Sequence, residues 1–473
     1  MFKQKHVHFI GIGGIGMSGI AEILNLQGYK VSGCDLSSKD SKVLDHLKYL
    51  GCEVFDQHSA DHLQDVDVVV YSSAVRKDNP EIVGAIEQGI PVIPRALMLA
   101  ELMRAKNGIT ISGAHGKTTT TSLISHILIE VGQSPTVVVG GILKNISNNA
   151  LIGKSNLLIA EADESDRSFL YLNPTYAIVT NIDAEHLDTY KDLDDIKNTF
   201  KSFLSKLPFY GRAIVCIDDA SVRSILPLNH VPTIKYGLST DADVMGEILE
   251  IAPNYSRFNV YLQNPSKLRH HSFNVEGNQS IKLGEVLLNI PGKYNVLNAL
   301  AAISLCLEFK IPFEQIEKSI ESFKGVERRF EFKGTFNGAE LYDDYGHHPT
   351  EIKNALTVAR LKKKNKLVAI FQPHRFSRTF KLWDDFVETF SGSGIDVLYI
   401  TDIYPASEDP IDGVTSERLA KAIAQKDPLI KIIYFPTYDE IEADVRNVLQ
   451  PDDLLLTIGA GKVNKIAEHL AKS

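Results

Sequence analysis

A glycine-rich turn followed by lysine and threonine is the segment whose residue types most clearly indicate chemistry. It lies between a short apolar run and a helical pattern that extends to about residue 130. The turn consists of Gly113, Ala114, His115, Gly116, Lys117, Thr118 and Thr119. Backbone N–H groups at such a helix start bind phosphates, the lysine reaches the terminal phosphates, and the threonine hydroxyl can ligate Mg²⁺. Although Ile111 replaces one glycine of the usual pattern, we interpret the run as a phosphate loop for a nucleoside triphosphate.

A second glycine turn lies near the N-terminus, after an apolar strand and before a helical pattern. It contains Gly11, Gly13, Gly14 and Gly16, and Asp35 follows about twenty residues later. This spacing fits the fingerprint of NAD-binding sheets, in which an acid accepts a ribose hydroxyl. A helix N-terminus with open backbone binds any diphosphate, however. The residues by themselves therefore leave three interpretations of this turn open: it binds NAD, it binds another diphosphate ligand, or it is purely structural.

Polar residues follow two further strands, where sheets of this class bind ligands. Glu161 comes directly after the apolar run 157–160, the place where an ATP-binding enzyme positions a Mg²⁺ ligand. We interpret Glu164 and Asp166, which follow it, as residues of a solvated acidic loop. His186 comes after the strand 177–180 and is a candidate ligand for a second metal ion or a partner of a phosphate.

The last third of the chain repeats this arrangement with basic side chains. Arg375 and Arg378 follow a strand and can hold a carboxylate in forked hydrogen bonds. His347 and His348 are adjacent, but they lack the spacing and the cysteine partners of a zinc site, so we exclude zinc there. Arg329 can reach a transferring phosphate. The alternative is that it belongs to a pair of surface arginines.

Alternating strand and helix patterns must position these residues, and they divide the chain into three blocks. We predict an α/β protein with a Rossmann-like N-terminal domain, a central phosphate-loop ATPase-like domain and a Rossmann-like C-terminal domain. Short alternating segments between about residues 234 and 291 predict a small antiparallel appendage on the central domain. The predicted boundaries are 1–106, 107–325 and 326–473.

Composition excludes several other classes of protein. The chain has 473 residues, 44% of them hydrophobic, and a net charge of -9, which argues against nucleic acid as a partner. No apolar run approaches the ~18 residues of a membrane span, and the glycines after residue 10 interrupt any signal-peptide pattern. Four widely spaced cysteines show no metal-ligand spacing and indicate reduced thiols. We therefore expect a cytoplasmic enzyme that is a monomer or a weak homodimer.

Taken in order, the motifs resemble those of the Mur ligases, ATP-dependent amide-forming enzymes of peptidoglycan precursor synthesis. The resemblance extends over essentially the whole chain. Its motifs are residues 8–18, 113–119, 161–166 and 181–188, the pair Asn295 and Asn298, and residues 328–330, 343–350 and 372–379. The combination is specific, although each motif by itself is modest.

The resemblance implies that L-alanine is joined to UDP-N-acetylmuramate through an acyl phosphate made with ATP and Mg²⁺. The UDP substrate, rather than NAD, would contact Gly13, Gly14, Gly16, Asp35, Ser72 and Ser73. ATP, between the central and third domains, would contact residues 113–119, Asn295, Asn298, Arg329 and Asp344. Magnesium would be held by Thr118, Glu161 and His186, and L-alanine by Tyr345, His347, Arg375 and Arg378. The implied catalytic residues are Lys117, Glu161, His186 and Arg329.

Two alternatives and two departures from the family pattern accompany this prediction. A related ligase attaches a preformed tripeptide to the same UDP sugar in wall recycling, and an NAD-dependent oxidoreductase is a more distant alternative. The oxidoreductase would leave Lys117 and Glu161 without a role. Tyr294 stands where the family often has histidine, and Lys201 lies near the position of a carbamoylated lysine that the alanine-adding members look to lack.

Overall fold

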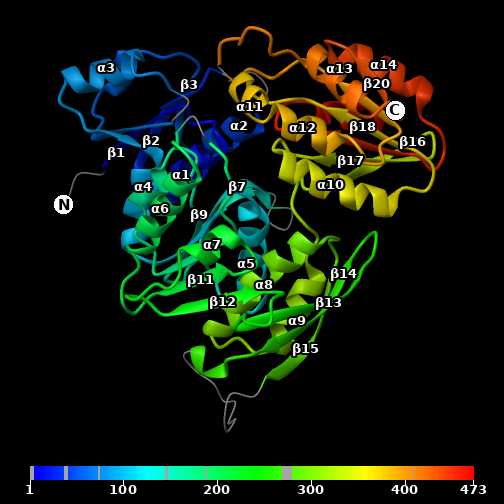
Figure 1. The fold of residues 1–473 in the computed structure, drawn as a ribbon. Helices are drawn as coiled ribbons and strands as arrows, with labels where there is room; N and C mark the ends of the chain where they lie inside the picture. Colours follow the sequence, from blue (N-terminus) through cyan, green and yellow to red (C-terminus); the bar gives the residue numbers. More distant parts are fainter. Residues whose placement is uncertain are drawn as a thin grey trace. The chain divides into compact units, whose positions relative to one another are not determined.

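Three β-sheets with helices on their faces form the protein (Figure 1). The computed structural model describes residues 5–36, 41–72, 75–143, 148–186, 189–268, 280–406 and 408–473. Within these ranges no helix combines the length and apolar character needed to cross a membrane. The predicted three-domain α/β architecture is confirmed.

The first sheet has five parallel strands in the order β3-β2-β1-β4-β5. Its strands are β1 (His6–Ile10), β2 (Lys30–Cys34), β3 (Glu53–Phe55), β4 (Val68–Tyr71) and β5 (Val92–Pro94). The helices are α1 (Ile15–Leu26), α2 (Lys42–Tyr49), the 3₁₀ helix η1 (Ala60–Leu63), α3 (Pro80–Glu87) and α4 (Arg95–Arg104). This strand order is that of a doubly wound nucleotide-binding sheet, whose ligands bind at the carboxyl ends of the strands.

The central sheet has ten strands in the order β15-β14-β13-β12-β11-β10-β6-β9-β7-β8. The strands up to β12 are β6 (Asn107–Ser112), β7 (Thr136–Leu143), β8 (Asn148–Leu151), β9 (Leu157–Glu161), β10 (Tyr176–Val179), β11 (Arg212–Cys216) and β12 (Thr233–Gly237). Their helices are α5 (Lys117–Glu130), the 3₁₀ helix η2 (Ser168–Tyr171), α6 (Leu193–Leu204) and α7 (Ala220–Ser224). Because β6 lies between β9 and β10, the polar residues that follow these three strands meet at one edge.

The segment predicted to form an antiparallel appendage continues the central sheet. It contains β13 (Val244–Ile251), β14 (Ser256–Leu262), the 3₁₀ helix η3 (Pro265–Lys267) and β15 (Ile281–Leu288), and α8 (Lys293–Glu308) and α9 (Phe313–Ser322) follow. β13 and β14 are neighbours joined by a short turn, in which the Ala252 N–H donates to the Tyr255 carbonyl. Strands joined so closely must run antiparallel.

The third sheet has six strands in the order β16-β17-β21-β18-β19-β20, of which only the β16–β17 pair among those described is antiparallel. Its strands are β16 (Glu331–Phe336), β17 (Ala339–Asp344), β18 (Leu367–Phe371), β19 (Val397–Ile400), β20 (Lys431–Tyr434) and β21 (Leu454–Ile458). The helices are α10 (Pro349–Lys362), α11 (Phe376–Lys381), α12 (Trp383–Phe390), α13 (Ser416–Lys426), α14 (Tyr438–Val448) and α15 (Asn464–Leu470). β18 is buried along its whole length, as expected for a central parallel strand with both faces covered.

Three strands, β3, β8 and β16, were not predicted from the sequence. For β16 a signal was present, because Asn337 and Gly338 form the two-residue turn into β17. Both residues have positive φ, 49° and 78°, as the favoured hairpin turn requires. β16 and β17 form an antiparallel edge that a search for alternating strands and helices does not detect.

Contacts divide the chain into two compact units. One consists of Met1–Ile248, Phe258–Leu287 and Val296–Lys324, and the other of Leu249–Arg257, Leu288–Asn295 and Gly325–Ser473. In the first unit α1 packs against β7 and β8, and buried side chains such as Ile20 and Val138 belong to one shared apolar core. The first two sheets therefore pack together.

Candidate functional site

The turn between β6 and α5 has the backbone geometry of a phosphate loop. Gly113 has φ 133° and Gly116, which precedes the first helical residue, has φ 84°. A Cβ at Gly113 would lie 2.2 Å from the Thr180 hydroxyl oxygen, and one at Gly116 would lie 2.5 Å from the Asn298 amide oxygen. Both positions thus require glycine for conformation and for space. No side chain caps the start of α5, so its first N–H groups can bind an anion.

The two residues that follow β10 hold this loop through hydrogen bonds. Asn181 accepts a hydrogen bond from the His115 N–H at 2.8 Å, and its amide donates to the His115 carbonyl at 2.9 Å. The Thr180 hydroxyl donates to the same carbonyl at 2.6 Å. From α8, Asn298 accepts from the Thr120 hydroxyl at 3.2 Å. The loop is therefore preorganised, and Asn298, assigned by resemblance to the adenine side, contacts the loop itself.

Lys117 is held in place by a buried ion pair. Its Nζ lies 2.9 and 3.0 Å from the two carboxylate oxygens of Glu164 and 2.6 Å from the Gly113 carbonyl. Burial alone would lower the pKa of Lys117, but the charges of Glu164 and Asp163 raise it, so the side chain is an ammonium. The assignment of Glu164 to a solvated loop is wrong, because Glu164 is only 3% exposed. Asp166, assigned to the same loop, is exposed.

Three side chains beside Lys117 form a candidate metal centre. One donor atom each from Glu164, Glu185 and His186 lies within 4.8 Å of the others. The His186 Nε2 is 3.8 Å from Glu164 and 3.6 Å from Glu185, and the backbone of His186 is left-handed, with φ 55°. Mg²⁺ prefers carboxylate oxygens, so the Glu164 and Glu185 carboxylates fit the ion, and His186 adds an imidazole nitrogen beside them.

The predicted ligands lie at the same edge of the sheet, with Glu161 ending β9 next to the phosphate-loop strand. Thr118 is in the first turn of α5, where its carbonyl accepts from the Ser122 hydroxyl at 2.7 Å. Sequence reasoning missed Glu185 as a possible ligand. The signal was its position directly before His186, in a run of polar residues after a strand.

The N-terminal glycine turn is tied to the end of β2. The Gly13 N–H donates to the Asp35 carboxylate at 2.8 Å, and a Cβ at Gly13 would lie 2.7 Å from the same carboxylate. A Cβ at Gly16 would approach the Arg95 guanidinium to 2.9 Å. The Ser72 N–H donates to the Ile10 carbonyl at 3.4 Å, and Ser73 lies outside the described residues. Gly14 precedes α1, so the start of this helix also faces the turn.

In the C-terminal unit, Asp344 organises the loop that follows β17. Its carboxylate accepts from the N–H groups of Phe330 and Gly346 at 2.8 and 2.7 Å. Burial raises the pKa of Asp344 to about 6, although the charge of Arg329 opposes this. Arg329 lies over the Tyr345 ring, 5.5 Å from its centroid, and 3.5 Å from Glu351. The Arg329 side chain is 31% exposed, so its two interpretations, a phosphate contact and a surface arginine, both stay predictions.

The predicted L-alanine residues gather near His374. The ring centroids of His347 and His374 are 5.8 Å apart, and Arg378 donates to the His374 carbonyl at 3.2 Å. Burial lowers the pKa of His347 well below its usual value, which makes the imidazole neutral. Arg375 has φ 72° and lies 3.8 Å from Glu408. These groups form a polar surface with two guanidinium groups, as recognition of an amino-acid carboxylate requires.

Four other residues from the sequence analysis have simple positions. His348 caps α10 by accepting from the Thr350 N–H at 3.4 Å. The Asn295 amide donates to the Pro291 carbonyl at 2.8 Å. Tyr294 is 47% exposed and Lys201 is exposed.

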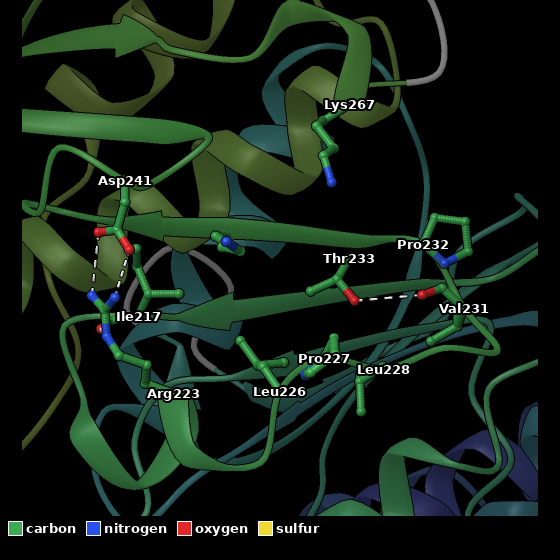
Figure 2. A pocket seen from close by; sticks show the side chains of 11 residues that line it. Ile217, Arg223, Leu226, Pro227, Leu228, Val231, Pro232, Thr233, Asp241 and Lys267 are labelled. Atoms are coloured by element: carbon green, nitrogen blue, oxygen red, sulfur yellow. Dashed lines mark hydrogen bonds and ion pairs between the residues drawn. The ribbon is translucent and has the colours of Figure 1, made fainter.

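A separate pocket of about 460 Å³ opens beside β11 and β12 (Figure 2). Apolar side chains such as Leu226 and Leu228 line its floor, Lys267 points toward it, and Arg223 is paired with Asp241 at one end. Among its described lining residues there is none of the predicted site. We therefore locate the chemistry at the phosphate loop rather than in this pocket.

The fold and the site define a three-domain α/β protein with a phosphate-loop turn between β6 and α5. Three family descriptions match consecutive parts of the chain: "Mur ligase family, catalytic domain" at residues 6–107, "Mur ligase middle domain" at 111–306, and "Mur ligase, glutamate ligase domain" at 328–461. The chain belongs to the Mur ligase family, whose members are ATP-dependent ligases.

Individual relatives match over nearly their whole length. The chain is 48% identical over 472 residues to the UDP-N-acetylmuramate–L-alanine ligase of Geobacter sp. (strain M21), covering 99% of this chain and 97% of that protein. The crystal structure of the UDP-N-acetylmuramate–alanine ligase of Thermotoga maritima has a TM-score of 0.79 at 26% identity and covers 99% of this chain and 98% of its own. A murein peptide ligase from Psychrobacter arcticus 273-4 has a TM-score of 0.70 at 22% identity, with the same coverage, and shows a shared fold.

Proposed function

We propose that this protein joins L-alanine to the carboxylate of UDP-N-acetylmuramate with consumption of ATP, as a step of peptidoglycan precursor synthesis. The observation that carries the proposal is the 48% identity over 99% of the chain to a ligase of that name. The tripeptide-attaching alternative has weaker support, because the murein peptide ligase is 22% identical. Family membership also removes the reason to consider an oxidoreductase.

The reaction must overcome the low reactivity of a carboxylate toward an amine. Transfer of the γ-phosphoryl group of ATP to the muramoyl carboxylate gives an acyl phosphate. The L-alanine amine attacks this group, and the tetrahedral intermediate collapses to the amide and phosphate. Because both phosphoryl donor and acceptor are anions, most of the catalysis is charge neutralisation and positioning. Positioning alone is worth up to ~7–11 kcal/mol.

Lys117 supplies the first of these charges. Its ammonium lies 2.9 Å from the Glu164 carboxylate, and in the proposed reaction the γ-phosphate would take the place of this carboxylate. Glu164, Glu185 and His186, together with the predicted Thr118 and Glu161, would hold Mg²⁺. The ion, when bound, neutralises phosphate oxygens. When Lys117 moves from Glu164 to the phosphate, the Glu164 carboxylate would thus become available beside the ion.

The other two substrates are assigned to different parts of the chain. The glycine turn with Asp35 would hold the diphosphate and ribose of the UDP sugar. Arg375 and Arg378 would hold the carboxylate of L-alanine, and the C-terminal Arg329 and Asp344 would contact the nucleotide. These roles, and the cytoplasmic location expected from the sequence, are parts of the proposal.

One assay tests the proposal and its nearest alternative together. Phosphate release is measured with ATP, Mg²⁺ and UDP-N-acetylmuramate while single amino acids and the tripeptide are added in turn. We expect strong stimulation by L-alanine and formation of one amide product, confirmed by mass spectrometry. Stimulation by the tripeptide alone would identify the alternative, and no response to L-alanine would refute the proposal. A titration with NADH, followed by nicotinamide fluorescence, checks the oxidoreductase.

A further inference from the structure

A second cluster of ligand-type side chains is buried in the first domain, outside the site described above. Its centre is Glu81 in the first turn of α3, whose side chain is fully buried. One carboxylate oxygen accepts from His62 at 2.8 Å and from His8 at 3.2 Å. The other lies 2.7 Å from the Cys34 sulfur and 2.9 Å from the His58 Nδ1. Four polar side chains thus converge on one carboxylate.

These side chains come from four separate segments of the chain. His8 is in β1, Cys34 ends β2, His58 and His62 belong to the connection from β3 through η1, and Glu81 is in α3. Figure 1 shows β1, β2, β3 and α3 gathered at the N-terminal end of the chain. Three imidazoles and one thiol, all of them ligand-type groups for metal ions, are thus gathered around a single buried carboxylate.

The donor atoms lie close enough for one ion. The sulfur of Cys34, the Nδ1 of His58 and the nearer oxygen of Glu81 are mutually 2.7–2.9 Å apart. The Nε2 of His8 lies within 4.8 Å of the Cys34 and Glu81 donors. Bonds of 2.0–2.3 Å in a tetrahedron separate the donors by about 3.3–3.8 Å, so each close pair needs to open by less than about 1 Å.

We propose that Cys34, His58, Glu81 and His8 form a binding site for a zinc-type divalent cation. One thiolate, two imidazoles and one carboxylate are the ligand types of tetrahedral zinc, whereas Mg²⁺ and Ca²⁺ take oxygen ligands. The site is separate from the Glu164–His186 cluster in both sequence and donor chemistry.

The proposed ligands have hydrogen-bond partners of the kind that a metal site needs to orient its ligands. The other nitrogen of the His8 ring is 2.8 Å from the Ser32 hydroxyl, which can donate or accept and so can hold either imidazole tautomer. His62 hydrogen-bonds the second oxygen of Glu81 and stacks on Phe55 at 3.8 Å between ring centroids. Partners of this kind orient metal ligands in proteins. The His58 side chain is 20% exposed and provides a path for entry from solvent.

The proposed zinc site lies next to the N-terminal glycine turn, which is the segment assigned to the UDP substrate. This position gives the site a structural role. The Cys34 carbonyl accepts from the N–H groups of Gly11 and Ile12 at 2.8 and 3.1 Å, and Asp35 is the next residue. An ion on Cys34 would therefore link the glycine turn to α3 and to the His58 segment. The ion would have no substrate group to act on within this cluster. It would therefore stabilise the glycine turn rather than take part in the ligation.

The test measures Zn²⁺ binding by the full untagged chain under reducing conditions, in competition with a chromophoric chelator and with Mg²⁺ and ATP present. We expect one tight site per chain, and a thiolate-to-metal absorption band when Co²⁺ replaces Zn²⁺. His58→Ala and Cys34→Ser should each weaken binding by at least about 100-fold, and the Co²⁺ band should disappear with Cys34→Ser. His46→Ala, at an exposed histidine of the same domain, and Cys52→Ser, at a buried cysteine, are matched controls that should bind normally.

Several results would overturn the proposal. These are the absence of a tight site in the wild type, unchanged binding in both ligand variants, and a Co²⁺ complex without the thiolate band. Loss of binding in His186→Ala with retention in Cys34→Ser would place the ion at the central cluster instead. Because Cys34→Ser can disturb a buried core, the more exposed His58→Ala variant decides the outcome, and its circular dichroism must match that of the wild type.

Discussion

Replacement of Lys117 by methionine separates its role in catalysis from its role in stability. The variant keeps the length of the side chain and removes the charge that lies 2.9 Å from Glu164. The Glu164 side chain is only 4% exposed, so its carboxylate is left buried with its main partner lost. Removal of one member of such a pair costs about 3–5 kcal/mol of unfolding free energy. At roughly 2–4 °C per kcal/mol, the melting temperature should fall by about 6–20 °C.

A second substitution tests this explanation. Glu164→Gln in the Lys117→Met background removes the uncompensated charge at nearly constant shape. We expect the double variant to recover most of the lost melting temperature, measured by circular dichroism with and without ATP. Phosphate release should stay at least about 10³-fold below the wild type in both variants, because the γ-phosphate still lacks its ammonium. UDP-N-acetylmuramate affinity, measured by calorimetry, should be nearly unchanged.

Three results would refute the reasoning. If Lys117→Met melts at the wild-type temperature, the ion pair is not the buried, stabilising contact that its geometry indicates. If the double variant is no more stable than the single one, Glu164 is not the group left unpaired. If more than a tenth of the ligase activity remains, Lys117 is not the phosphate ligand.

Further predictions concern the metal centre, the C-terminal unit and the amino-acid pocket. EDTA should abolish ligation and Mg²⁺ should restore it; Glu185→Gln should raise the half-saturating Mg²⁺ concentration about tenfold, whereas the control Asp166→Asn should not. The raised pKa of Asp344, about 6, means that the folded state binds the proton more tightly, so stability from this group is present below about pH 4 and is lost as pH rises to 6. The stability of the wild type relative to Asp344→Asn should therefore fall by on the order of 3 kcal/mol across that window in urea unfolding, and a flat difference would contradict the burial argument. Arg378→Ala should raise the KM for L-alanine at least about tenfold and leave that for ATP unchanged; an equal rise in both would argue against its role in the pocket.

Local sequence patterns predicted much of the fold. The uninterrupted apolar runs 367–371 and 454–458 of the sequence coincide with β18 and β21, because central parallel strands are buried on both faces and need no polar alternation. Short strands such as β3 were missed, since three residues, one exposed and two half-buried, carry too little periodicity. The antiparallel appendage on the central domain was predicted, but its pairing with β12 was not, because the pattern of a strand does not say which strand it pairs with.

What the sequence determined by itself is the phosphate loop, since glycine spacing, positive φ and the start of a helix are set within seven consecutive residues. The same is true of the glycine turn with Asp35 and of the positions where strands end. What only the tertiary structure decided is which side chains meet. Glu164 is 47 residues from Lys117, and Asn298 is 178 residues from Thr120, so their contacts depend on the order of strands in the sheet. Cys34 lacks metal-ligand spacing in the sequence, yet packing of β1, β2 and α3 brings it to His58 and Glu81. Burial then gives these groups charges and partners that the residue types alone do not specify.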